Sequence, residues 1–138
     1  MKIIAVLLLS LATLSLSAQD IWNVKFKGRT RVIARSEDTV RNFVEIRKKD
    51  LSKSSLEVIY KQVEPTAGFR RSIMLYTPTD SLLLQKEGKS LKLTEADLRK
   101  WVKTQPVIYI YTVNVPTDPK MKEAVRVRRM HLCTVRFI

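Results

Sequence analysis

Cysteine, histidine and glycine are scarce in this chain. Its 138 residues include one cysteine, one histidine and three glycines. A single cysteine, Cys133, excludes an intrachain disulfide framework. A single histidine, His131, excludes a metal site built from several imidazoles of one chain, and it makes catalysis by a serine–histidine type of triad a poor expectation. The sequence therefore predicts neither an enzyme nor a cofactor.

The one long apolar run lies at the N-terminus. A basic start is followed by an apolar stretch over residues 3–16 and by small residues up to Ala18, the order typical of a secretory signal peptide. We expect cleavage after Ala18, with a cut after Ser17 as the alternative and an uncleaved anchor as the other interpretation. Residues 1–18 are thus predicted to be the signal peptide, and residues 19–138 a single domain.

The expected location follows from this segment. The junction Ala18-Gln19 after a centre rich in leucine and serine resembles export signals of Bacteroidota, which implies a bacterial envelope protein in the periplasm or at the cell surface. Lipid attachment needs a cysteine at the cleavage site, and Cys133 lies far from it. No later membrane span is expected, because the longest later apolar stretch, Val107–Tyr111, is far below the roughly 20 residues of a spanning helix.

Period-two alternation dominates the rest of the chain. Trp22, Val24 and Phe26 alternate with polar residues, and the segment 107–115 is apolar on both faces, as in a central strand. Strands are predicted over 22–26, 30–34, 39–47, 56–60, 69–77, 81–86, 107–115 and about 125–137. The segment 39–47 also fits helical spacing, but its β-branched residues favour a strand.

One segment shows helical signals. Thr94 is predicted to cap a helix, and Asp97 at the third helical position forms a weaker version of the capping box. Leu98 and Trp101 then share one face of the helix, because they lie three residues apart. We predict one short α-helix near residues 95–103.

About eight strands and one short helix predict a mainly β fold. The turn signals every 8–15 residues favour an antiparallel β-sandwich, with a small barrel as the alternative. The alternation changes phase within the last strand, which either a bulge near Arg128-Arg129 or a change of environment along one long strand would explain.

His131 and Cys133 are the one candidate for a reactive pair in the sequence. Two residues apart on a strand, their side chains are expected to share a face. Such neighbours are about 7 Å apart, which is too far for a direct hydrogen bond between thiolate and imidazole. A blue-copper site needs two histidines, and this chain has one. We expect Cys133 to be a buried core residue, and we assign no catalytic, cofactor-binding or metal-binding residue.

Positive charge is the strongest global feature. Lysine and arginine number 26 against 13 aspartate and glutamate, a net charge of +13, from which the predicted signal removes only Lys2. A field of this size concentrates anionic partners near the surface. The candidate anion-binding residues are Lys25, Lys27, Arg29, Arg31, Arg126, Arg128 and Arg136. Basic residues on outer strand faces also protect sheet edges, so the pattern has a purely structural interpretation as well.

Three non-catalytic hypotheses follow, and an enzyme with a pocket at His131 and Cys133 is the remaining, least favoured class. The first is a non-catalytic module that binds another envelope component, and the second is a binder of anionic glycan or lipid headgroups through the basic strand faces. Nucleic acid is not an expected partner, because the chain is predicted to be exported. The third is a sugar-stacking platform, although alternating aromatic residues usually pack against other side chains. Its members would be Trp22, Tyr60, Tyr76, Trp101, Tyr109 and Tyr111.

Overall fold

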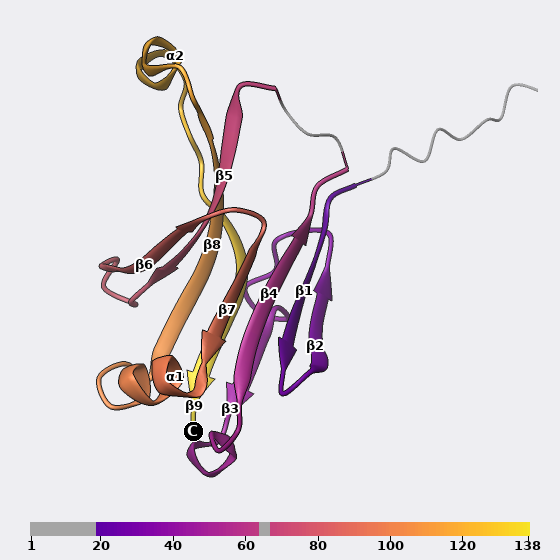
Figure 1. Ribbon diagram of the computed structural model, residues 1–138, viewed down its shortest axis with the longest axis vertical. Coiled ribbons are helices and arrows are strands. Elements are labelled where there is room, and N and C mark those ends of the chain that lie inside the picture. Colours follow the sequence, from indigo (N-terminus) through magenta and orange to yellow (C-terminus); the bar gives the residue numbers. More distant parts are fainter. Residues whose placement is uncertain (1–18, 64–66) are drawn as a thin grey trace, which may run out of the picture.

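The computed structural model describes residues 19–63 and 67–138, which form two sheets (Figure 1). The four-stranded sheet has the order β2-β1-β4-β7, with β1 (Ile21–Phe26), β2 (Arg29–Ala34), β4 (Ser55–Lys61) and β7 (Ser90–Thr94). The five-stranded sheet has the order β3-β9-β8-β5-β6, with β3 (Phe43–Ile46), β5 (Phe69–Tyr76), β6 (Leu82–Glu87), β8 (Val107–Pro116) and β9 (Met130–Phe137). The predicted mainly β sandwich is confirmed. The predicted signal peptide, residues 1–18, lies outside the described residues.

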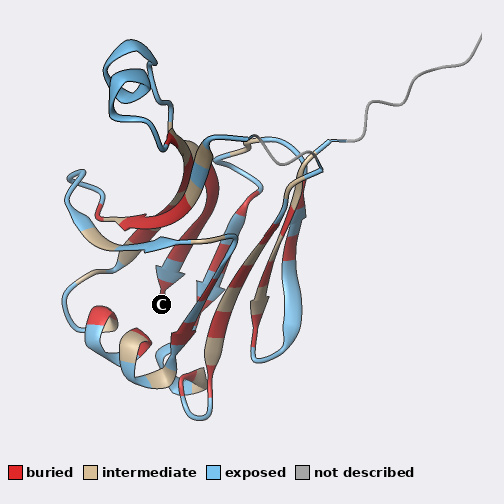
Figure 2. Ribbon diagram, turned by 45° about the horizontal axis from the view of Figure 1, so that its top comes forward, coloured by how far each residue is buried: buried red, intermediate tan, exposed pale blue. Residues whose placement is uncertain are grey.

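The core lies between the two sheets (Figure 2). Trp22, Val24 and Phe26 are buried as the alternation of β1 predicts, and the intervening residues are only partly covered. The five-stranded sheet contributes fully buried residues such as Ile73 and Ile110. Removal of this apolar surface from water is the main favourable contribution to folding.

One hydrogen bond joins the two layers through the core. The indole Nε1 of Trp22 donates to the backbone oxygen of Leu132 at 3.0 Å. In the β8–β9 pairing, Ile110 faces Cys133 and Tyr111 faces His131, so Leu132 has no partner residue. The bulge therefore lies at Leu132, and its expected position near Arg128-Arg129 is wrong because β9 begins only at Met130.

The five-stranded sheet is not antiparallel throughout. Strand β3 runs parallel to β9, while the other pairings among the described residues are antiparallel. The predicted strand over 39–47 is confirmed only for its second half. Asp38 Oδ1 accepts hydrogen bonds from the backbone N–H groups of Val40 and Arg41, both at 3.0 Å, and this turn delays the start of the strand.

A second helix interrupts the predicted last strand. Helix α2 (Pro119–Ala124) begins with proline at a first-turn position, and the Asp118 side chain accepts from Lys120 N at 2.9 Å. The helix stands away from the sandwich in Figure 1 and buries none of its residues. Arg126 and Arg128 consequently lie in the connection between α2 and β9, and their assignment to a strand is wrong.

The predicted helix is present as α1 (Glu95–Val102). Thr94 and Asp97 form a complete capping box: Asp97 N donates to Thr94 Oγ1 at 3.3 Å, and Thr94 N donates to Asp97 Oδ2 at 2.9 Å. Leu98 and Trp101 are buried, as their spacing predicts. Strand β7 directly precedes α1 and was not among the predicted strands, and a short 3-10 helix, η1 (Lys48–Asp50), follows β3.

Candidate functional site

Part of the predicted basic set converges on one side of the sandwich. Lys27, Arg29 and Arg31 line adjoining hollows where β2, the edge of one sheet, meets β3, the edge of the other. Lys25 does not join them, because it lies within β1 opposite Glu57 of β4. Lys27 is part of the turn between β1 and β2, where its φ of 52° is in the left-handed region.

A bulge in β2 sets Arg31 apart from its neighbours. Val24 pairs with Val32 and Lys25 pairs with Thr30, so Arg31 is the extra residue of the β1–β2 pairing. Bulges change the direction of a side chain relative to the regular alternation. The Arg31 guanidinium lies over the Phe26 ring, with its carbon 5.8 Å from the ring centroid, a cation–π contact.

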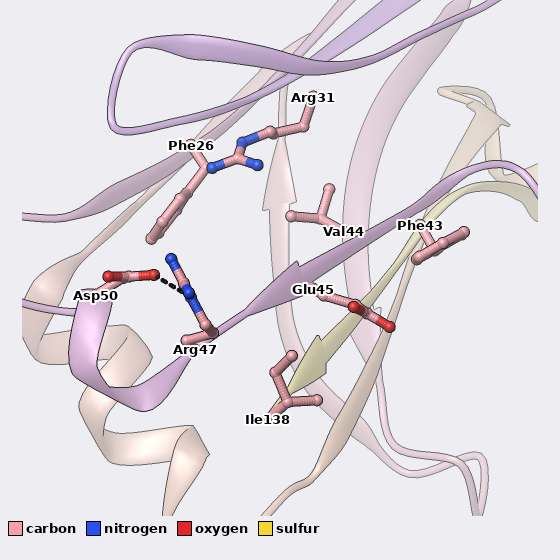
Figure 3. Close-up of a pocket in the computed structure, with 8 residues that line it drawn as sticks. All are labelled: Phe26, Arg31, Phe43, Val44, Glu45, Arg47, Asp50 and Ile138. Carbon is pink, nitrogen blue, oxygen red and sulfur yellow. Dashed lines mark hydrogen bonds and ion pairs between the residues drawn. The ribbon is translucent and has the colours of Figure 1, made fainter.

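We call this surface the edge groove, and it consists of three hollows that all share Arg31. The hollow drawn in Figure 3 has a volume of about 390 Å³ and places Arg31 beside Phe26, near the ion pair between Arg47 and Asp50. The lining residues of the whole groove are Phe26, Lys27, Arg29, residues 31–36, Asp38, residues 41–45, Arg47, Asp50 and Ile138.

Positive charge is in excess along the edge groove. Six basic and three acidic side chains line it, a net charge of +3. Two of the acids are engaged: Asp50 with Arg47 at 2.8 Å and Asp38 with Arg41 at 3.8 Å. The hydrogen bond from Arg47 lowers the pKa of Asp50, and the charge of Lys27 adds to this effect.

Four basic side chains of the groove lack an acidic partner. Across residues 19–63 and 67–138, no carboxylate lies within ion-pair distance of Lys27, Arg29, Arg31 or Arg35. Arg35, Arg41 and Arg47 were missed among the candidates predicted from the sequence. They were missed because the alternation within the β1–β2 hairpin does not indicate that β3 and η1 lie beside β2.

Exposed apolar side chains accompany these charges. Ile33 is 64% exposed, Phe43 is 40% exposed and Ile138 is 57% exposed, and all three line the groove. Large apolar side chains beside unpaired strand edges are a feature of surfaces that bind other chains.

The remaining predicted basic residues lie outside the groove. Arg136 on β9 lies over the ring of Phe43, 5.9 Å from its centroid, and so borders the groove on the outer face of its sheet. Arg128 forms an ion pair with Glu37, and Arg126 is exposed in the connection after α2. The seven predicted residues therefore do not form one surface: three are in the groove, one borders it and three are elsewhere.

His131 and Cys133 do not form a reactive pair. The bulge at Leu132 places Cys133 opposite Ile110 in the core, whereas His131 pairs with Tyr111 on the other face, so the expected shared face is wrong. Cys133 is fully buried as predicted, and burial raises the pKa of its thiol to about 12.

His131 is packed on the outer face of the five-stranded sheet. Its ring lies edge-on to Tyr109 and Tyr111, and its Nε2 is 2.8 Å from Thr134 Oγ1. Burial lowers the pKa of His131, although the nearby Glu37 carboxylate opposes the shift. The side chain therefore packs among the tyrosine rings and contacts the Thr134 hydroxyl.

The proposed aromatic platform is divided between environments. Trp22 and Tyr60 are buried and stack on each other in the core, with ring centroids 5.9 Å apart. Trp101 is buried on the packed face of α1, and only the three remaining tyrosines lie on the outer face of the five-stranded sheet. A single six-residue stacking surface does not exist.

The described residues contain neither a metal-binding cluster nor a membrane-spanning helix. No group of three or more histidine, cysteine, aspartate or glutamate side chains is arranged to hold a metal ion there. No helix in this part of the chain has the length and apolar character needed to cross a membrane. Comparisons of the chain with family models, curated proteins and solved structures gave no match.

Proposed function

We propose that this chain is an exported, non-catalytic module of a bacterial envelope, and that it binds an acidic surface of another envelope protein through the edge groove. The observation that supports this most directly is the set of four basic side chains without acidic partners, beside two open strand edges. The exposed Ile33 and Phe43 add apolar contact area to the same surface.

The charges favour rapid association with an acidic partner. Exposed ion pairs contribute only about 0.2–1 kcal/mol each, so the groove's charge by itself steers encounter more than it holds a complex. The apolar residues and the unpaired backbone groups of β2 and β3 would supply the remaining contacts.

A second candidate is an anionic glycan or lipid headgroup bound at the same surface. It is favoured by Lys27, Arg29 and Arg31, which lie together with no carboxylate within ion-pair distance, since such a cluster suits a repeating anion. The two candidates differ in their use of the exposed apolar side chains of the groove. A protein partner would bury Ile33 and Phe43, whereas an anionic glycan or headgroup would bind mainly to the basic side chains.

The test compares two double variants of equal net charge. The groove variant carries Arg29→Gln and Arg31→Gln, and the control carries Lys100→Gln and Lys103→Gln, at exposed positions in or beside α1. Each purified protein is used to capture partners from the native envelope, with identification by mass spectrometry. We expect one acidic protein to be lost with the groove variant and kept with the control.

Retention on heparin and on lipopolysaccharide tests the second candidate. A glycan or headgroup site predicts that the groove variant elutes at clearly lower salt than the control variant. Equal behaviour of the two variants in both assays would show that the groove has no special role. Export itself is checked by N-terminal sequencing of the secreted chain, which should begin at Gln19.

A further inference from the structure

A second, smaller hollow lies at one end of the sandwich, where β4 ends and β5 begins. We call it the end cleft; it has a volume of about 260 Å³ and shares no lining residue with the edge groove. Its lining residues are Gln62, Phe69, Arg70, Arg71, Glu87, Gly88, Lys89 and Asn114.

The turn between β6 and β7 gives the cleft a fixed wall. Gly88 N donates to the backbone oxygen of Arg71 at 2.8 Å, in the five-stranded sheet. The backbone oxygen of Lys89 accepts from Tyr60 N at 2.7 Å, in the four-stranded sheet. Gly88 has a φ of +132° and no side chain, so the wall at this point leaves backbone open to a ligand.

Arg71 is held in place within the cleft. Its Nε donates to Gln62 Oε1 at 3.3 Å, and its Nη1 donates to Thr112 Oγ1 at 3.1 Å. The guanidinium lies over the Tyr60 ring, 4.1 Å from the centroid. Thr112 is fully buried and donates in turn to the backbone oxygen of Ser72 at 2.9 Å.

This arrangement leaves hydrogen-bonding capacity for a ligand. A guanidinium has five N–H donors, and two of those of Arg71 are used by partners among the described residues. Because the side chain is already ordered, a bound anion would lose little affinity to the entropy of fixing it.

The carboxylates of Asp20 and Glu87 near the cleft are engaged by groups other than the Arg71 guanidinium. Asp20 accepts from the Tyr60 hydroxyl at 2.5 Å and from Val63 N at 3.0 Å, and Glu87 pairs with Arg70 at 3.5 Å. Burial opposes ionisation of Asp20, but these two hydrogen bonds and the charges of Arg71 and Lys89 outweigh it and lower its pKa.

The other lining groups indicate the kind of anion. A guanidinium suits the planar carboxylate, which it binds through two parallel hydrogen bonds. Asn114 offers an amide that both donates and accepts, as sugar hydroxyls require, and the half-buried Phe69 offers an aromatic surface for the apolar face of a sugar ring.

We propose that the end cleft binds one carboxylate-bearing sugar residue, with its carboxylate on Arg71 and its ring against Phe69. The cleft is separate from the edge groove, so this inference does not depend on the function proposed above. A small cleft with a few convergent polar groups and an aromatic wall matches the usual character of a ligand site.

The test is calorimetric titration of the full exported chain with short oligogalacturonate. The matched neutral galactose oligomer and an acidic aspartate peptide serve as comparison ligands. We expect binding of the uronate, with at least about tenfold weaker affinity for the neutral sugar, because the charged hydrogen bonds to Arg71 are lost. Binding of the aspartate peptide as tightly as the uronate would overturn the assignment to a sugar.

Variants locate the ligand within the protein. Arg71→Lys and Asn114→Ala should each weaken uronate binding about tenfold, whereas Arg99→Gln, an exposed site on α1, should leave it unchanged. Because Arg71 also joins the two sheets, thermal melting accompanies each variant, and Asn114→Ala decides the matter if Arg71→Lys does not fold. The proposal would be refuted if Asn114→Ala and a folded Arg71→Lys both bound the uronate with unchanged affinity. It would also be refuted if the protein did not bind the uronate at all.

Discussion

Replacing Trp22 with phenylalanine tests how the two sheets are held together. The indole is 1% exposed, and its Nε1 is the partner of the Leu132 carbonyl across the core. Since Leu132 lies at a bulge, that carbonyl would be left in an apolar environment without the indole. An unsatisfied buried acceptor costs about 1–3 kcal/mol, and the smaller ring loses about 1–2 kcal/mol of packing.

The expected loss for Trp22→Phe is therefore about 2–5 kcal/mol. For a domain of this size this corresponds to a fall in Tm of roughly 10–20 °C. Trp101→Phe is the matched control, because Trp101 is 8% exposed and its indole has no hydrogen-bond partner among the described residues. This control should lose only the packing contribution.

Thermal and urea unfolding, followed by circular dichroism, measure both variants. The difference between them isolates the hydrogen bond to Leu132, and we expect it to be about 1–3 kcal/mol. Equal losses in Trp22→Phe and Trp101→Phe would refute the reasoning. They would show that the indole contributes through its volume and that the bulge carbonyl finds another partner.

Three further predictions concern titratable groups. Burial lowers the pKa of His131 below its ordinary value of 6.5, so the folded state resists protonation and the free energy of unfolding should decrease as pH falls below about 6.5. Burial raises the pKa of Glu37, but the hydrogen bonds from Arg128 and from the His131 backbone N–H, together with the charge of Arg128, outweigh it and lower that pKa, which predicts a second decrease below about pH 4.5. Urea titrations across this range check both, and His131→Gln should abolish the first decrease alone. Cys133, with a thiol pKa of about 12 and no exposed surface, should not react with a thiol reagent at pH 8 until urea unfolds the chain; fast reaction of the native protein would contradict its burial.

Local sequence patterns determined much of the fold. Alternation in β1 predicted the burial of Trp22, Val24 and Phe26, because successive side chains of a strand point to opposite faces. The capping box of α1 was readable because it involves only Thr94 and a residue three positions later. Both signals depend on neighbours in the chain, so they required no knowledge of tertiary contacts.

Strand pairing and bulges were decided by the tertiary structure. The parallel pairing of β3 with β9 joins segments about 90 residues apart, and no period in the sequence specifies a partner. The bulges at Arg31 and Leu132 each change the side-chain alternation at one position, which separated His131 from Cys133 and turned Arg31 toward Phe26.

For the candidate sites, too, the sequence determined one part and the tertiary structure decided another. The excess of positive charge was evident from composition, and Arg29 and Arg31 of the predicted hairpin line one hollow. The addition of Arg47 to the groove, and the fixing of Arg71 between Tyr60 and Thr112, required two sheets to meet. Composition determines how much charge the surface carries, whereas only packing decides which charges lie together, because side chains distant in sequence become neighbours when the layers close.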